Sequence, residues 1–330
     1  MGSLAEAFRL RWLRRRLLWR AMRAQLRPVM RRDFGRDAIL GFACIRNEMG
    51  RLPWFLDHHR KLGVDHFLVV DNASSDGSAE FLAGQPDVSL WATSDSYKAS
   101  RFGMDWINAL LMRHGSGHWC LTLDADELFT FPEDHRGLRA LTDWADARAV
   151  PAISALMLDL YPKGPLGTQT PDPNPLMVLP FFDPEGYART PIARYAHVSI
   201  RGGPRARVFF ADDPARAPHL HKTPLVRWHW RYAYLSSTHL ALPIRLNAGF
   251  ARADLPTGAL LHTKFLPEIV QKSREERVRA EHFTHPEYYG DYYDGVIAGR
   301  DLWHPGSARY EGPTQLEALG LIQRGAWASR

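Results

Sequence analysis

Two aspartates separated by one residue, Asp124 and Asp126, are the side chains whose type and spacing point most directly to chemistry. They follow the apolar run of residues 119–123, which is typical of a buried strand, so both carboxylates stand where that strand ends. Carboxylates in this position can reach a common hard divalent cation, directly or through water. A cation held there would neutralise diphosphate oxygens and stabilise a departing nucleotide. The alternative is a solvated turn.

The elements that position this pair follow an alternating pattern from residue 37 onward. Short apolar runs predict strands, and segments with helical periodicity lie between them. This alternation predicts an α/β fold with a mostly parallel sheet and helices on both of its faces. The predicted strands span residues 38–45, 66–70, 88–91 and 118–123, and the predicted helices span residues 52–62, 76–82 and 99–113.

Polar side chains follow three of these predicted strands at the point where each strand ends. Arg46 and Glu48 follow the first strand, Asp71 follows the second, and the aspartate pair Asp124 and Asp126 follows the fourth. The carboxyl ends of parallel strands share one edge, where ligands bind in open α/β sheets, so we expect these side chains to converge. The sequence contains neither a P-loop pattern nor a strand-linked GxGxxG, which disfavours NTPase and dinucleotide-binding functions.

Four motifs in this region resemble family 2 glycosyltransferases of the GT-A fold and their relatives in family 92. The motifs are Ala43-Cys-Ile-Arg-Asn-Glu48, Leu62-Gly-Val-Asp-His-Phe67, Asp71-Asn-Ala-Ser-Ser-Asp76 and Leu123-Asp-Ala-Asp-Glu127. The similarity covers roughly residues 38–131. It implies a nucleotide-sugar donor, with a UDP-sugar expected, a bound Mn²⁺ or Mg²⁺, inversion at the anomeric carbon, and a glycan or lipid-linked polysaccharide precursor as acceptor.

The resemblance also implies roles for single residues of these motifs. Arg46 and Glu48 would line the nucleoside pocket, and Asp71 would accept a hydrogen bond from the base. Asp124 would approach the ribose or the metal ion, and Asp126 would be the firmer metal ligand.

Three later residues are assigned by the same resemblance. Arg101 falls where these enzymes often place a residue near the donor phosphates, although a surface arginine at the start of a helix explains it equally well. His262 closes an apolar run, and Lys264 follows two residues later, as in the C-terminal element of several GT-A enzymes. By this analogy His262 would complete the metal shell and Lys264 would meet the diphosphate, roles that suit imidazole and ammonium groups.

The sequence does not fix the catalytic base. An inverting transfer needs a carboxylate that accepts the proton of the acceptor hydroxyl. Among the carboxylates that follow the metal motif, we favour Asp183 and Asp213, because each lies in a loop flanked by proline.

Residues 1–36 carry the positive charge of the chain. They hold eleven arginines against Glu6 and Asp33, a net charge of +9 in a chain whose total is +6. The rest of the chain is therefore net negative, which disfavours nucleic-acid binding. We predict a helix, interrupted at Pro28, that docks on an anionic membrane surface. The alternatives are a helix that packs on the protein body and a transit peptide. Its two apolar stripes are Leu10, Leu13, Leu17, Ala21 and Ala24, and Phe8, Trp12, Trp19 and Leu26.

These observations divide the chain into four parts. Residues 1–36 form the basic tail, residues 37–132 the nucleotide-sugar-binding half, residues 133–265 the acceptor-side half of the same domain, and residues 266–330 a helical and aromatic extension. The helix of this extension is expected over residues 266–283. Cys44 and Cys120 are expected to be reduced core thiols.

The leading functional hypothesis is a metal-dependent glycosyltransferase. The alternatives are a nucleotidyltransferase and a membrane-recruited binding protein with a degenerate GT-A site. The sequence shows no apolar run of membrane-spanning length and no secretory signal, so we expect a cytoplasmic protein that is peripheral on the inner membrane face.

Overall fold

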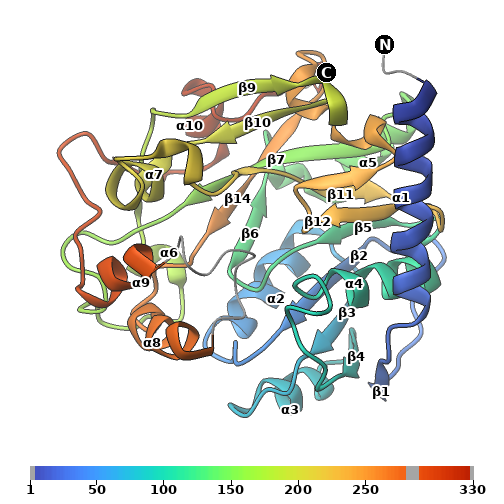
Figure 1. The fold of residues 1–330 in the computed structure, drawn as a ribbon, viewed down its shortest axis with the longest axis horizontal. Helices are drawn as coiled ribbons and strands as arrows, with labels where there is room; N and C mark the ends of the chain where they lie inside the picture. The colour runs from blue at the N-terminus through green and yellow to red at the C-terminus, as the bar shows by residue number, and fades with distance from the viewer. Residues whose placement is uncertain (1–3, 280–289, 328–330) are drawn as a thin grey trace.

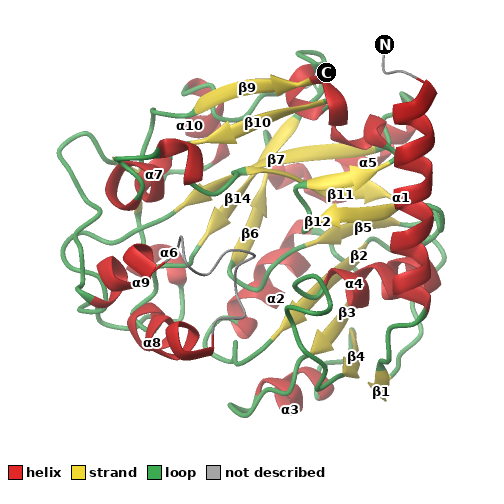
Figure 2. Cartoon of the chain, in the orientation of Figure 1, coloured by secondary structure: helices red, strands yellow, loops and turns green. Residues whose placement is uncertain are grey.

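A computed structural model describes residues 4–279 and 290–327 and gives a mixed α/β fold (Figures 1 and 2). The strands are β1 (Arg27–Met30), β2 (Leu40–Ile45), β3 (His66–Asp71), β4 (Val88–Ala92), β5 (Trp119–Thr122), β6 (Glu127–Thr130), β7 (Ala152–Asp159), β8 (Phe181–Phe182), β9 (Ala188–Ile192), β10 (His197–Arg201), β11 (His221–Arg227), β12 (Ala233–Ser236), β13 (Leu240–Leu242), β14 (Thr257–His262) and β15 (Ala308–Arg309). The α-helices are α1 (Leu4–Met22), α2 (Leu52–Leu62), α3 (Ser78–Ala83), α4 (Met104–Leu110), α5 (Gly137–Ala147), α6 (Pro175–Val178), α7 (Gly203–Phe209), α8 (Ile269–Arg279), α9 (Gly290–Ile297) and α10 (Pro313–Ala318).

One large sheet organises the molecule. Within the described residues it has nine strands in the order β1-β4-β3-β2-β5-β11-β7-β14-β6. Neighbouring strands from β4 to β5 pair in parallel. β11 enters between β5 and β7 antiparallel to both, β14 runs parallel to β7, and β6 pairs antiparallel with β14. The predicted α/β fold is confirmed, and one sheet contains strands from both halves of the chain.

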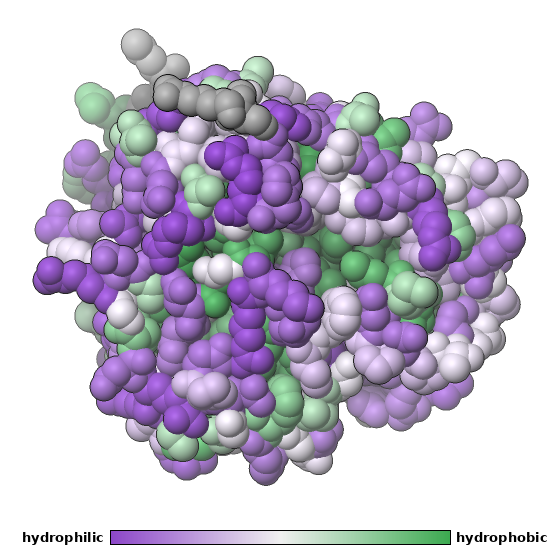
Figure 3. Space-filling view, turned by 180° about the vertical axis from the view of Figure 1, so that it is seen from behind, coloured by the Kyte–Doolittle hydropathy of each residue, from purple (hydrophilic) through white to green (hydrophobic). Residues whose placement is uncertain are grey.

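Helices cover both faces of the parallel block, because alternate strand residues point to opposite sides. Val69 packs in the cluster that includes α2 and α5, whereas its neighbour Val70 packs in the cluster that includes α4. Both cysteines are free thiols, as expected. Seen from behind, the surface is mostly hydrophilic, with hydrophobic residues visible across its middle (Figure 3).

The predicted strands and helices of residues 38–123 are present; most of their ends differ from the prediction by no more than two residues, and the start of one helix differs by five. α4 begins at Met104 rather than near residue 99. Arg101, Phe102 and Gly103 have φ values of 56°, 58° and 76°, which are left-handed and do not fit an α-helix. A π-helical turn over Leu111–Gly115 continues α4.

α1 lies along one side of the molecule (Figure 1) and ends at Met22, before the proline predicted to interrupt it. Its leucine and alanine stripe faces the body: Leu17 and Ala21 are buried, and Leu17 packs with Ala233 of β12 and Leu242 of β13. Pro28 lies in β1, at the sheet edge, where the missing N–H of proline is tolerated. No helix in the described segments is long and apolar enough to cross a membrane.

The C-terminal helix predicted over residues 266–283 is present as α8 from Ile269, and residues 280–283 lie outside the described residues. The predicted apolar run that ends at His262 is the strand β14.

Four histidines pack together where β10 and β11 meet the loop before β13. The ring centroid of His221 lies 4.6 Å from that of His197 and 5.6 Å from that of His239. His219 lies 5.3 Å from His221. Burial, together with neighbouring histidines and cations, lowers the pKa of His239 to about 3 and the pKa of His221 to about 2. These two imidazoles therefore stay neutral in the folded protein well below pH 6.

This cluster predicts a loss of stability in acid. Unfolded histidines bind protons near pH 6.5, whereas the folded His239 binds one only near pH 3, so the free energy of unfolding should fall as the pH drops below about 6.5. Each such histidine should contribute a slope of about 1 kcal/mol per pH unit. His239→Asn keeps a donor for the carbonyl of His221, 2.6 Å away, and should flatten this slope in denaturant titrations from pH 7 to pH 5. His135→Asn, at an exposed histidine, is the control, and equal slopes in all three proteins would contradict the prediction.

Candidate active site

The candidate active site lies at the carboxyl edge of the sheet, where its register brings three polar residues into line. In β6, β14 and β7, Glu127 stands opposite His262, and His262 stands opposite Asp159. Asp124 and Asp126 lie in the short connection between β5 and β6. The backbone N–H and hydroxyl of Thr263 both donate to the carbonyl of Asp126, at 2.7 and 3.0 Å, and fix this connection against the end of β14.

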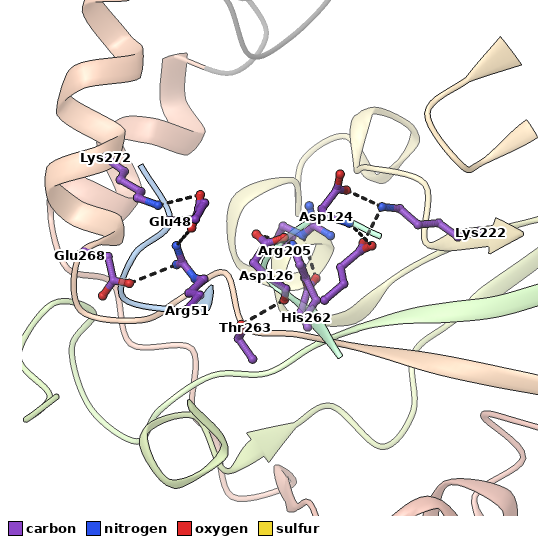
Figure 4. Close-up of polar contacts among 12 residues, drawn as sticks. Glu48, Arg51, Asp124, Asp126, Arg205, Lys222, His262, Thr263, Glu268 and Lys272 are labelled. Carbon is purple, nitrogen blue, oxygen red and sulfur yellow. Dashed lines mark hydrogen bonds and ion pairs between the residues drawn. The ribbon is translucent and has the colours of Figure 1, made fainter. Parts of the chain in front are cut away.

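A chain of buried ionic contacts starts from Asp126 (Figure 4). His262 Nε2 lies 3.2 Å from Asp126 Oδ2, and His262 Nδ1 lies 2.6 Å from Asp159 Oδ1. Arg205 of α7 donates from Nε to Asp159 Oδ2 at 2.7 Å. The side chains of His262, Asp159 and Arg205 are 7%, 1% and 7% exposed.

The charges in this chain of contacts set the pKa values of its members. Burial alone would lower the pKa of His262, but Asp126 and Asp159 outweigh it, so the pKa of His262 is raised. Burial opposes ionisation of Asp126, yet His262 and then Lys264 hold its pKa well below the usual range. The carboxylate of Asp126 is therefore ionised, and the site combines negative and positive groups at close range.

A buried lysine binds the other aspartate of the pair. Lys222 of β11, 3% exposed, donates from Nζ to Asp124 Oδ2 at 2.8 Å and also to Glu127 Oε1. The backbone N–H of Asp124 donates to Glu127 Oε2 at 3.1 Å. Lys222, Glu127, Arg205 and the pairing role of Asp159 were missed by the sequence reasoning. The available signal for Lys222 was a lysine directly before the run Thr-Pro-Leu-Val, which is buried in the sheet.

Glu48 lies beside this group and is held by cations (Figure 4). Arg51 donates to Glu48 Oε2 at 2.6 Å, and Lys272 of α8 donates to Glu48 Oε1 at 2.8 Å. Arg51 also approaches Glu268 at 3.5 Å and lowers the pKa of Asp126. The loop after β2 is thus tied to the start of α8.

The expected nucleoside residues lie farther along the same edge. Asp71 ends β3, is buried, and accepts the backbone N–H of Ser74 at 3.2 and 3.3 Å. Arg46 Nη1 donates to the carbonyl of Asn72 at 3.2 Å. A cavity of about 620 Å³ adjoins Asp71 and is lined in part by Arg27 of β1.

The structure places three of the predicted residues outside this group: Arg101, Asp213 and Asp183. Arg101 Nε donates to Asp105 at 2.8 Å and Nη1 donates to the carbonyl of Leu235 at 2.8 Å, which ties the start of α4 to β12. Asp213 is exposed and pairs with Arg216 at 2.9 Å.

Asp183 lies in a separate cavity of about 660 Å³ next to α7. Arg207 binds both of its carboxylate oxygens at 3.0 Å, and the hydroxyl of Tyr161 donates to one of them. His304 Nε2 lies 3.4 Å away. Arg207 is two residues from Arg205, so α7 separates this cavity from the chain of contacts around Asp126.

The arrangement of the residues at the carboxyl edge of the sheet decides whether they fit a divalent cation. Among the described residues, no group of three or more His, Cys, Asp or Glu side chains is arranged as a metal site. Asp126 and His262 Nε2 nevertheless face one another, and Asp159 orients the imidazole as carboxylates orient metal-bound histidines. Asp124 is 49% exposed, with Lys222 on Oδ2. These donors fit a cation if donor oxygens and water supply the remaining ligands.

Comparisons with known proteins add little to this geometry. No known family profile and no curated protein matches the chain. Among solved structures, the chain is similar to the mannosyltransferase PcManGT from Pyrobaculum calidifontis in complex with GDP-Man and Mn²⁺, with 18% identity and a TM-score of 0.25. The match covers 48% of this chain and 46% of that chain, less than half of either. The function of this protein therefore has to be argued from its own residues.

The buried contacts predict that Asp159 is essential for stability. Asp159→Asn removes the anionic charge between His262 and Arg205, so we expect the free energy of unfolding to fall by about 3–5 kcal/mol. Asp213→Asn, at an exposed ion pair, should change it by about 0.5 kcal/mol or less. Denaturant titrations measure both, and an Asp159→Asn protein as stable as the wild type would contradict the prediction.

Proposed function

We propose that this protein is a glycosyltransferase that moves a sugar from a nucleotide-diphosphate donor, with a UDP-sugar expected, to a hydroxyl of a glycan or lipid-linked precursor. One observation carries the proposal. Asp124, Asp126 and His262 come from stretches up to 138 residues apart and meet at the carboxyl edge of an α/β sheet. Three of the four motifs that resemble GT-A enzymes end at this same edge.

The surrounding cations support a diphosphate leaving group. Three cations, Lys222, Lys264 and Arg205, lie among the carboxylates. Burial lowers the pKa of Lys264, and the charge of Arg205 lowers it further. Asp126 raises it, but not enough to reverse the decrease. Lys264 is the residue we assign to the diphosphate. A point charge fixed there stabilises the negative charge that grows as the nucleotide departs.

A divalent cation is part of the proposal. Asp126, His262 and the exposed side of Asp124 would hold it, and it would supply Lewis-acid neutralisation of the diphosphate. Asp159 keeps the Nδ1 proton of His262 on its own side, so that Nε2 faces Asp126. Arg205 in turn holds Asp159 in place.

The transfer itself needs an acceptor hydroxyl and a base. The hydroxyl oxygen bonds to the anomeric carbon, the bond from that carbon to the diphosphate oxygen breaks, and its electron pair leaves with the diphosphate. The hydroxyl proton passes to a carboxylate. Asp183 and Asp213 remain the candidates from the sequence, and neither lies in the chain of contacts around Asp126. Because Arg207 and Tyr161 occupy its oxygens, Asp183 has to release one of these contacts to accept a proton.

A second part of the proposal concerns α1, which we assign to an anionic membrane surface. Leu4 and Phe8 are 92% and 74% exposed, and Trp12, Trp19 and Met22 on the same face are each more than half exposed. Partial burial lowers the pKa of Arg14, and the charges of Arg11, Arg231 and Arg245 lower it further. Clustered positive charge beside exposed aromatic side chains suits a lipid surface with anionic headgroups.

The donor site predicts nucleotide binding that depends on Asp126. UDP, GDP or another nucleoside diphosphate should raise the melting temperature, because a ligand at one hundred times its Kd stabilises the folded protein by about 2.7 kcal/mol. Mn²⁺ should increase this rise in melting temperature. Asp126→Asn should abolish the increase due to Mn²⁺ and sugar transfer. Asp65→Asn, just before β3 at the opposite edge, is the matched control. A wild-type protein that responds to no nucleoside diphosphate would refute the proposed function.

The outer face of α1 predicts binding to anionic vesicles. Phe8→Ser/Trp12→Ser/Trp19→Ser leaves the inner stripe of α1 intact and should reduce co-sedimentation with phosphatidylserine-containing vesicles. Wild-type binding should weaken with salt and be lower on phosphatidylcholine alone. Met177→Ser/Leu319→Ser removes exposed apolar side chains elsewhere and should bind like the wild type. Equal pelleting of the two variants would refute the assignment.

A further inference from the structure

We propose that Lys222 is a positioning residue, which holds Asp124 in the orientation that meets the nucleotide-sugar donor. The inference rests on the proposed function and gives a role to a residue to which the resemblance assigns none. Lys222 has this role because it joins a carboxylate inside the protein, Glu127, to one that is half exposed at the site, Asp124.

The position of β11 makes this contact possible. β11 lies between β5 and β7, so Lys222 enters the site from the middle of the sheet. Its pairing with β7 shifts register between Lys222 and Leu225, around Pro224. Such irregularities re-aim side chains, and here the side chain of Lys222 reaches the connection that follows β5.

The energetics of burial argue for a role in function. A buried ion pair is often no more stabilising than apolar residues of similar volume, because both ions lose their hydration. Lys222 and Glu127 are 3% and 0% exposed. Burial lowers the pKa of Lys222, but Asp124 and Glu127 more than offset it, so the ammonium group stays charged. The pair is buried and contributes little to stability, but Lys222 also binds Asp124 at the candidate site. A positioning role therefore explains why the pair is there.

Together, Lys222 and Glu127 fix Asp124 at two points. Lys222 Nζ binds Oδ2 at 2.8 Å, and Glu127 Oε2 accepts the backbone N–H at 3.1 Å. The carboxylate can then rotate little, and its Oδ1 is the oxygen left to meet the donor.

A set of variants separates positioning from simple neutralisation of Glu127. Lys222→Met alone leaves Glu127 buried without its cation and should lose stability. Lys222→Met/Glu127→Gln removes both charges and should regain much of that stability. We expect the double variant to bind UDP at least tenfold more weakly than the wild type, by titration calorimetry without metal, and its KM for the donor to rise more than its kcat falls. If Lys222 only neutralised Glu127, the double variant would bind UDP like the wild type, and this result would overturn the inference.

Two further variants complete the experiment. Asp124→Asn leaves the Lys222–Glu127 pair in place and should weaken UDP binding as much as the double variant does. If Lys222 acts through Asp124, adding Asp124→Asn to the double variant should weaken UDP binding no further. Unchanged UDP affinity in a folded Asp124→Asn protein would also overturn the inference. Arg60→Met/Asp87→Asn removes a close ion pair at the opposite edge of the sheet and should leave UDP binding unchanged.

The two proposals fail in different ways. A wild-type protein that binds no nucleoside diphosphate contradicts the proposed function, and the inference with it. A wild-type protein that binds UDP, and a double variant that binds it equally well, contradict the inference alone.

Discussion

The register of β14 between β6 and β7 is the constraint on which the candidate site depends. It places His262 between two carboxyl residues, Glu127 across one strand pair and Asp159 across the other. Side chains alternate between the faces of a sheet, so a slip of one residue would turn His262 to the opposite face. The contacts to Asp126 and Asp159, and through Asp159 to α7, would then be lost together. The geometry of the site is therefore a consequence of strand pairing more than of any loop.

The same edge concentrates charges that are costly to bury. Ionised groups lose hydration there, and only close pairing makes their burial tolerable. Three buried cations at the site are matched by carboxylates: Arg205 by Asp159, Lys222 by Glu127 and Asp124, and Arg51 by Glu48. The exposed side of Asp124 is the place where this network meets solvent. A divalent cation bound to Asp124, together with an anionic ligand such as a diphosphate, would continue this alternation of positive and negative groups beyond the edge of the sheet.

The sequence was sufficient to predict the parallel block, since each strand is an apolar run whose polar residues follow its end. It also located Asp124, Asp126 and the strand that ends at His262. It could not reveal the partners. The pairing of Glu48 with Lys272 spans 224 residues, and that of Lys222 with Asp124 requires β11 to enter the sheet beside β5. Periodicity describes single elements, whereas strand order and side-chain partners are set by the packing of the whole chain. The late start of α4 was missed because two non-glycine residues adopt left-handed backbone there.

The basic helix and the sheet are coupled through one buried carboxylate. Asp105, in the first turn of α4, accepts Arg20 of α1 at 2.8 Å and Arg101 at 2.8 Å, and Arg101 also binds the carbonyl of Leu235 in β12. α1 is thus fixed to α4 and β12 by charge as well as by its inner apolar stripe. A membrane bound to the outer face of α1 would hold the sheet in a set orientation, and with it the edge that contains Asp124 and Asp126. In the proposed function, the lipid surface and the edge that contains Asp124 and Asp126 would keep one fixed orientation to each other, because the helix that binds the lipid cannot turn independently of the sheet.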